Sequence, residues 1–226
     1  MREQWCLPPE QDAAFVWQME DVLDVYTRPQ DPARPVVCLD ETSRQGRAAA
    51  RPARPAAPGT PRREDPEYVR HGVANPFLVC EPLRRWRQVR VSDHRTRPDW
   101  AACVKALLDV HYPTAERIVL VMDQLNIHSP ASLYGAYPPA EAKRLADKLE
   151  IHHTPKHGSW LNMAEIELGL LQRQCLDRRL GDRATMEREV AAWVRERNGA
   201  VRTIAWRFTS ADARIKLKRL YPAHDG

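Results

Sequence analysis

The sequence lacks the short motifs of several large enzyme classes. It contains neither a GxxxxGK[ST] phosphate loop nor a Gly-x-Ser-x-Gly turn, which argues against a P-loop NTPase and an α/β-hydrolase. It also has no Cys-x-x-Cys pair, and its five cysteines are scattered: Cys6, Cys38, Cys80, Cys103 and Cys175. We therefore expect reduced, mostly buried thiols rather than a disulfide framework or a zinc site.

Long apolar runs and a targeting segment are absent as well. No stretch approaches eighteen uncharged apolar residues, so we expect no membrane span. The start, MREQWCLPPEQD, lacks the basic and then apolar pattern of a signal peptide, which indicates a cytosolic protein. The chain does have 226 residues, 43% of them hydrophobic, which is enough for one sizeable domain. Its net charge of +5 suits a polyanionic partner.

The order of predicted elements favours an α/β fold, a mixed sheet with helices on its faces. A helix is predicted at 8–26, and β-branched or alternating runs predict strands at 36–41, 67–83 and 84–93. Beyond them, strands are predicted at 117–123 and 151–155, and helices at 99–112, 138–150, 160–176 and 183–198. The tail, 201–222, holds a strand candidate and a basic helical turn that is either a packed end or a DNA clamp.

We divide the chain into residues 1–34, a helix with a Pro-rich connector, and residues 35–226, the main domain. The segment near 44–66 is rich in Arg, Ala and Pro, so it is predicted to be an exposed, partly mobile loop or hairpin excursion. Its arginines would suit a DNA backbone, and a solvated loop explains them equally well: Arg44, Arg47, Arg51 and Arg54.

Two aspartates end predicted buried strands, Asp40 in VVCLD and Asp123 in RIVLVMD. The carboxyl ends of strands are where α/β proteins commonly place their sites. If the two strands are neighbours, these carboxylates repel each other unless a cation lies between them. Magnesium is the natural cation because it prefers hard oxygen ligands.

The helix predicted at 160–176 can supply a third carboxylate. Glu165 borders its apolar stripe, Asn162 lies one turn earlier and faces the same way, and Glu167 lies further round. The stripe consists of Leu161, Ala164, Leu168, Leu171 and Cys175. Each acid alone is also explained as a turn residue or a helix-start charge, but their joint arrangement favours one shared site.

The three segments that carry these acids are VVCLDE, IVLVMDQLNIH and TPKHGSWLNMAEIE. They resemble the acidic motifs of DDE transposases of the Tc/mariner superfamily, in particular its bacterial insertion sequence 630 branch. His128 lies five residues after Asp123, as in mariner-like members, and LNMAE (161–165) matches the third motif at Leu, Asn and Glu. Gln124 and Met163 depart from the pattern, and the spacing from Asp123 to Glu165 is longer than in mariner elements.

The resemblance implies a ribonuclease-H-like fold with a mixed five-stranded sheet and the activity of a transposase catalytic domain. Two Mg²⁺ ions, for which Mn²⁺ can substitute, would be held by Asp40, Asp123 and Glu165 for DNA strand cleavage and strand transfer at element ends. The supporting residues would be Asn162, His128 and Asn126, and the DNA contacts Lys156, His157, Arg44 and Arg47.

The implied partners are double-stranded DNA, as element ends and target, and a second copy of the chain. Family members usually carry helix-turn-helix modules ahead of the catalytic domain, whereas about 35 residues precede the first strand here. The helix among them is net acidic, so we expect a connector or oligomer contact. A separate upstream helix-turn-helix polypeptide would then provide specificity. The alternative is a non-catalytic DNA-binding remnant of a truncated element.

Two further groups have plainer explanations than their residue types suggest. His152, His153 and His157 are not expected to bind zinc, because Pro155 interrupts any helix that would align them. The aromatic residues Trp160 and Trp206 are expected to pack in the core rather than stack on bases.

Overall fold

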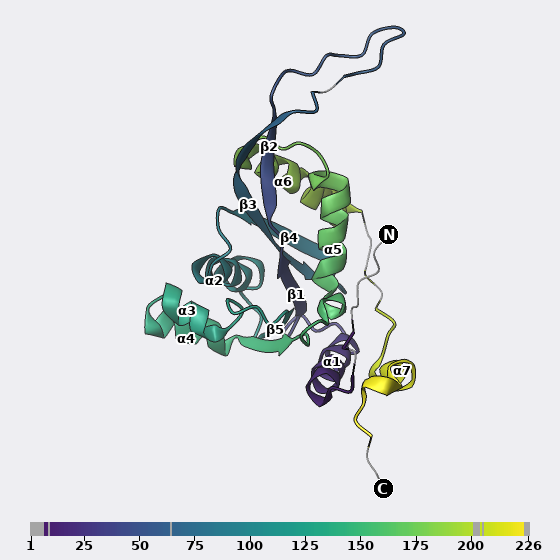
Figure 1. The fold of residues 1–226 in the computed structure, drawn as a ribbon. Helices are drawn as coiled ribbons and strands as arrows, with labels where there is room; N and C mark the ends of the chain where they lie inside the picture. The colour runs from purple at the N-terminus through teal and green to yellow at the C-terminus, as the bar shows by residue number, and fades with distance from the viewer. Residues whose placement is uncertain (1–6, 9, 64, 201–203, 205, 224–226) are drawn as a thin grey trace.

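A mixed six-stranded sheet forms the centre of the molecule (Figure 1). The computed structural model describes residues 7–8, 10–63, 65–200, 204 and 206–223. The strands are β1 (Val36–Glu41), β2 (Arg44–Ala49), β3 (Tyr68–Glu81), β4 (Trp86–Ser92), β5 (Ile118–Met122) and β6 (Leu149–His153). Five of them lie side by side in the order β4-β3-β1-β5-β6, with β1, β5 and β6 parallel and β3 antiparallel to β1 and β4.

The sixth strand, β2, continues the line of β1 along the first half of β3. It pairs with β3 from Arg44 opposite Ala74 to Ala49 opposite Tyr68, with a register shift between Gln45 and Gly46. A side chain at Gly46 would place its Cβ 2.3 Å from the carbonyl oxygen of His71, so this close approach of two strands requires glycine. The implied five-stranded sheet is therefore present, and one further strand extends it.

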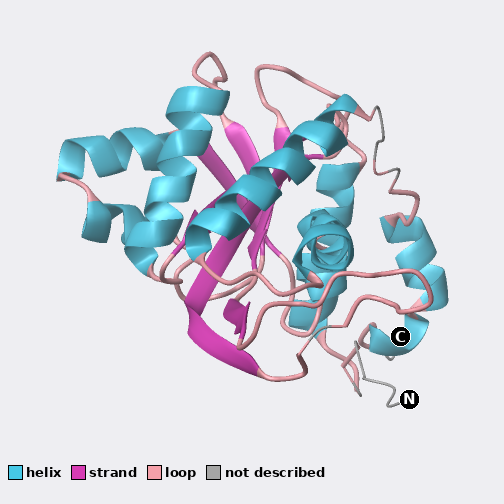
Figure 2. Ribbon diagram, turned by 90° about the horizontal axis from the view of Figure 1, so that it is seen from above, coloured by secondary structure: helices cyan, strands magenta, loops and turns pink. Residues whose placement is uncertain are grey.

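Helices cover both faces of the sheet (Figure 2). One face holds α2 (Arg97–Ala106) with a π-helical extension η1 (Leu107–His111), α3 (Pro130–Ala136) and α4 (Pro139–Asp147). The other holds α1 (Ala13–Tyr26), α5 (Met163–Leu171) with its extension η3 (Gln172–Leu176), α6 (Arg183–Gly199) and α7 (Ser210–Lys216). Along β1 the side chains alternate between the two cores, since Val37 and Leu39 face one and Cys38 the other.

Helix α1 belongs to the core of the main domain. It starts at Ala13 rather than at residue 8, because the side chain of Asp12 accepts a hydrogen bond from the Phe15 amide at 2.9 Å and caps the helix. Met19 and Leu23 are fully buried in the cluster that includes β1 and α5. The helix expected to be a connector or oligomer contact thus packs into the domain.

The remaining predicted elements are found with shifted bounds. The predicted helix at 138–150 ends at Asp147, and a separate short helix, α3, precedes it that was not predicted. Residues 50–63 and 65–66 belong to a hairpin excursion beyond β2 and β3, most of which is exposed (Figure 1). The strand candidate in the tail lies largely outside the described residues, and the basic turn forms α7 and η4 (Lys218–Leu220), whose Leu220 is buried as a packed end. None of the helices in the described part of the chain combines the length and apolarity of a membrane span.

Candidate active site

The two strand-end aspartates lie at the same edge of the sheet. Strands β1 and β5 are parallel neighbours, with Cys38 opposite Val121, so the register continues to Asp40 beside Asp123. Asp40 is 6% exposed, and its side chain accepts a hydrogen bond from the Glu41 amide at 2.8 Å. It shares a sheet face with Cys38, the face that α5 covers.

Asn162 fixes the start of α5 against β1 and so places Glu165. Its side-chain oxygen caps the helix by accepting from the Ala164 amide at 3.1 Å. Its side-chain nitrogen donates to the carbonyl oxygen of Leu39 at 2.9 Å, one residue before Asp40. Asn162 is fully buried, and Glu165, about one turn later, lies close enough to Asp40 for a side-chain hydrogen bond.

Burial and neighbouring carboxylates raise the proton affinity of Asp40 and Glu165. Burial raises the pKa of Asp40 to about 8, and the negative charges of Glu165, Glu41 and Asp123 add to this rise. The pKa of Glu165 is also raised, first by burial and then by the charge of Asp123, although hydrogen bonds from Ser159 and Asp40 oppose the rise. Asp40 and Glu165 thus retain a proton between them at neutral pH, as carboxyl groups do when no cation separates them.

This donor set fits divalent metal ions that are completed by a substrate. No three His, Cys, Asp or Glu side chains of the described residues are close enough to enclose an ion by themselves. Magnesium is usually held by one or two carboxylates together with water and substrate phosphates, so a full protein cage is not needed. A divalent cation would also replace the proton that Asp40 and Glu165 hold.

A buried histidine connects Asp123 to a second acid. The Nδ1 atom of His128 lies 2.6 Å from Oδ1 of Asp123, and its Nε2 atom lies 3.0 Å from Oε2 of Glu41. Burial lowers the pKa of His128, but its hydrogen bonds to Asp123 and Glu41 outweigh burial and raise it to about 9. For Asp123, burial raises the pKa, but the hydrogen bond with His128 makes the net shift downward.

Glu41 was not predicted as a site residue. It follows Asp40 directly, and successive side chains of a strand point to opposite faces. Its side chain is buried next to His128, 87 positions later in the chain, while Asp40 faces α5. The only sequence signal for Glu41 is a second acid at the end of a buried strand.

The second glutamate of α5 lies in a different environment. Glu167 is fully buried, with Nε of Arg87 at 3.2 Å and Nη2 of Arg197 at 2.8 Å. Arg87 on β4 is itself 2% exposed, and Asn198 of α6 pairs with both of its backbone groups at 3.0 and 2.9 Å. Glu167 therefore joins β4, α5 and α6 and does not face the aspartates.

The remaining residues predicted to support the site or to contact DNA differ in their exposure. Asn126 is exposed on the loop after β5, outside the buried contacts of Asp123. Lys156 and His157 are exposed in the loop before η2 (Ser159–Leu161), where His157 has a φ of 65°. Arg44 is half-buried and donates to the carbonyl oxygen of Leu176 at 2.6 Å, and Arg47 is exposed.

The three histidines His152, His153 and His157 do not form a shared metal site among the described residues. His152 contacts Asp21 at 2.7 Å and Glu150 at 3.2 Å, and His153 contacts the backbone carbonyl of Asp123 at 3.0 Å. Trp160 and Trp206 are half-buried and pack against the core, as expected.

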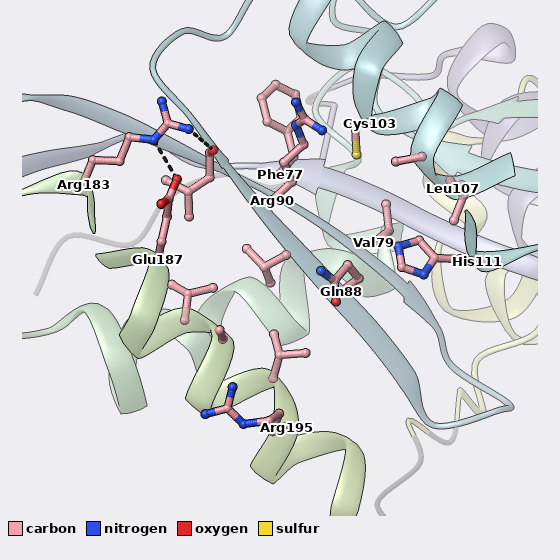
Figure 3. Close-up of a pocket in the computed structure, with 16 residues that line it drawn as sticks. Phe77, Val79, Gln88, Arg90, Cys103, Leu107, His111, Arg183, Glu187 and Arg195 are labelled. Carbon is pink, nitrogen blue, oxygen red and sulfur yellow. Dashed lines mark hydrogen bonds and ion pairs between the residues drawn. The ribbon is translucent and has the colours of Figure 1, made fainter. Parts of the chain in front are cut away.

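A hollow of about 530 Å³ lies elsewhere, between α2–η1 and α6 at the edge strand β4 (Figure 3). Its lining is largely apolar, and an Arg183–Glu187 ion pair of 2.8 Å closes one side. None of the three site carboxylates lines it, so this hollow is separate from the candidate active site.

Residues 35–187 match the family of DDE superfamily endonucleases. The chain belongs to this family. Its acidic triad lies within the matched region, and the observed sheet is the mixed sheet of a ribonuclease-H-like fold. No curated protein matches the chain by sequence.

Solved structures of similar fold are those of the Mos1 transposase. The Mos1 mariner paired-end complex with Mn matches at a TM-score of 0.55 and 13% identity, over 87% of this chain and 59% of that chain. The Mos1 strand transfer complex matches at a TM-score of 0.55 and 13% identity, over 89% of this chain and 58% of that chain. The paired-end complex with Mg matches at a TM-score of 0.52 and 12% identity, over 99% of this chain and 67% of that chain. The DDE endonuclease thus shares the fold and spans about 60% of the length of the first two chains.

Proposed function

We propose that this DDE endonuclease is the catalytic domain of a Tc/mariner-type transposase, from a bacterial element of the insertion sequence 630 branch. The observation that carries the proposal is that burial, together with the negative charges of Glu165 and Asp123, raises the pKa of Asp40 to about 8. The carboxyl groups of Asp40 and Glu165, which have no neutralising cation of their own among the described residues, together with Asp123 suit a metal-dependent phosphoryl-transfer site.

Asp40, Asp123 and Glu165 would hold two divalent ions, Mg²⁺ or Mn²⁺. Bound there, the ions would stabilise charge on the phosphate and lower the pKa of the attacking hydroxyl. The chain's own residues fix the geometry: Glu41 and His128 orient the carboxylate of Asp123, and Asn162 holds the start of α5. Lys156 and His157, exposed beside β6 on the loop that leads to α5, would contact the DNA.

The proposed substrate is double-stranded DNA, as element ends and as target. The similar Mos1 structures are paired-end and strand-transfer complexes, which supports ends and target as the two DNA partners. A homodimer is the proposed active form. The proposal includes action in the bacterial cytosol and end recognition by a separate helix-turn-helix polypeptide.

A nicking assay on duplex DNA tests the proposal. Purified chain should cut supercoiled DNA with Mg²⁺ or Mn²⁺ and not with EDTA, and Asp123→Asn should remove the cutting. Asp147→Asn is the matched control, because Asp147 is an exposed acid paired with Lys143 on α4. DNA binding without metal-dependent cutting by the wild-type chain would instead identify a non-catalytic remnant.

A further inference from the structure

A second concave surface lies beyond the candidate active site, at the base of the β2–β3 hairpin. It has a volume of about 900 Å³ and is bounded by β2, the start of β3 and the loop between η3 and α6. Six arginines and two aspartates line it, which gives the lining a net charge of +4. We call it the arginine groove; its charged residues are Arg44, Arg47, Arg51, Arg62, Arg178, Arg179, Asp65 and Asp177.

Three of these guanidinium groups contact carbonyl oxygens or an aromatic ring rather than an acid. Arg44 donates to the carbonyl oxygen of Leu176, and Arg179 donates to the carbonyl oxygens of Pro66 and Glu67 at 3.2 and 3.3 Å. Carbonyl oxygens orient a guanidinium without neutralising it. Arg47 lies 5.0 Å from the centre of the Tyr68 ring, which likewise leaves its charge in place.

Two other arginines of the groove are partly neutralised by acids. Arg51 lies 3.5 Å from Asp65 and 3.7 Å from Glu67, and Arg178 pairs with Glu189. The charge available to a ligand is therefore concentrated at Arg44, Arg47 and Arg179.

The side chain of Tyr68 lies where the electrostatic fields of several of these arginines overlap. Its side chain is 37% exposed in the groove, and its pKa is lowered by a hydrogen bond from Arg70 and by the charges of Arg47, Arg70 and Arg179. An exposed tyrosine whose phenolate is favoured lies in a positive potential. The same potential favours phosphate groups.

The groove lies near the far end of the helix that carries Glu165. Helix α5 and its extension η3 run from the candidate active site to Leu176, whose carbonyl oxygen binds Arg44. From Glu165 to Leu176 the helical rise gives roughly 17 Å. That is the length of about five base pairs of duplex, at about 3.4 Å each.

We propose that the arginine groove binds the phosphate backbone of duplex DNA about five base pairs from the scissile phosphate, through Arg44, Arg47 and Arg179. The volume of about 900 Å³ has room for more than one phosphate, and the charged groups come from three separate segments, which suits a repeating polyanion rather than a single phosphate. The position relative to the scissile phosphate rests on the proposed function.

The test compares two double variants that remove equal charge. Arg47→Gln/Arg179→Gln changes the groove, and Arg90→Gln/Arg117→Gln changes two exposed arginines on β4 and before β5. Affinity for a fluorescent DNA duplex is measured without divalent metal over a series of salt concentrations. The groove variant should bind at least about tenfold more weakly, and its slope of log affinity against log salt should be flatter by about 1.8, or 0.9 per phosphate contact. The control should stay within about twofold of wild type.

Arg47→Gln alone guards against misfolding of the double variant, because Arg47 is exposed. It should flatten the slope by about 0.9. Wild-type affinity and slope in the groove variants would overturn the proposal. So would unchanged DNA binding with loss of self-association in sedimentation, because the groove would then contact protein.

The result is independent of catalysis. Affinity is measured without divalent metal, so cutting does not contribute to it. If wild type never cuts DNA while the groove variants lose binding, the proposed function fails and the groove stands. If wild type cuts DNA and the groove variants bind normally, the proposed function stands and the groove proposal fails.

Discussion

Glu165 and Glu167 lie two residues apart on helix α5, and their surroundings are opposite. Glu167 is fully buried between the guanidinium groups of Arg87 and Arg197. Glu165 instead lies near the carboxyl groups of Asp40 and Asp123. No guanidinium of the described residues neutralises it, and its pKa is raised. A buried acid that the chain neutralises has a structural role, whereas crowded acids without a countercharge are the kind of group to which we assign metal binding in the proposed function.

The largest expected effect is on cleavage by Glu165→Gln. Loss of one metal-binding carboxylate should lower the rate of DNA nicking about a thousandfold or more, since metal assistance is worth several kcal/mol. The metal-free melting temperature should stay the same or rise, because one crowded charge is gone. Glu196→Gln, an exposed glutamate on α6, is the control and should cut like wild type. Near-normal cutting by Glu165→Gln would remove Glu165 from the triad.

Glu167→Gln should lower the stability of the fold and leave the rate of cleavage almost unchanged. It leaves the buried guanidinium of Arg87 and the half-buried guanidinium of Arg197 without a countercharge, and breaking a buried pair typically costs about 3–5 kcal/mol in the free energy of unfolding. Urea denaturation measures this loss. Glu189→Gln, at an exposed pair with Arg178, should cost less than about 1 kcal/mol. At a temperature where the variant is still folded, its cleavage rate should remain near that of wild type.

The pH dependence of stability should distinguish Asp40 from an ordinary aspartate. Its pKa in the folded chain, about 8, lies above its unfolded value, so folding favours the protonated form. The stability from this proton is complete below about pH 4 and is lost as the pH rises through about 8. Relative to Asp40→Asn, the metal-free wild type should therefore lose a few kcal/mol between pH 5 and pH 8.5, at about 1.4 kcal/mol per pKa unit. Denaturation curves at several pH values measure it, and parallel curves would contradict it.

The smallest effect concerns Glu41, which acts on Asp123 only through His128. Glu41→Gln should weaken Mg²⁺ binding about 10–100-fold, the usual result of removing a group that orients a metal ligand. Calorimetric titration with Mg²⁺ in the presence of uncleavable DNA measures the affinity. Glu81→Gln is a matched control, because Glu81 is a buried acid of the same sheet, hydrogen-bonded to Tyr112 at 2.6 Å. Equal losses in both variants would show a general structural effect.

The sequence predicts those parts of the fold that depend on local pattern. The apolar runs of β1 and β5 and the stripe of α5 are found as predicted, and the structure brings their acids together. Contacts between distant segments were not predictable. Arg87 sits in an alternating strand pattern that gives no sign of a buried guanidinium, and its partner Glu167 lies 80 positions away. The start of α1 was misplaced because the cap of Asp12 decides it, not the prolines before it.

The packing of α1 and α6 sets the size of the unit that can fold. The family match covers residues 35–187 and contains the whole acidic triad. Yet Phe15, Met19 and Leu23 before it, and Trp193 and Val194 after it, are buried in the same core. Asn198 also closes the edge of β4 through both backbone groups of Arg87. Expression boundaries drawn at the limits of sequence similarity would leave an open apolar face, so boundaries for a stable recombinant domain should enclose both helices.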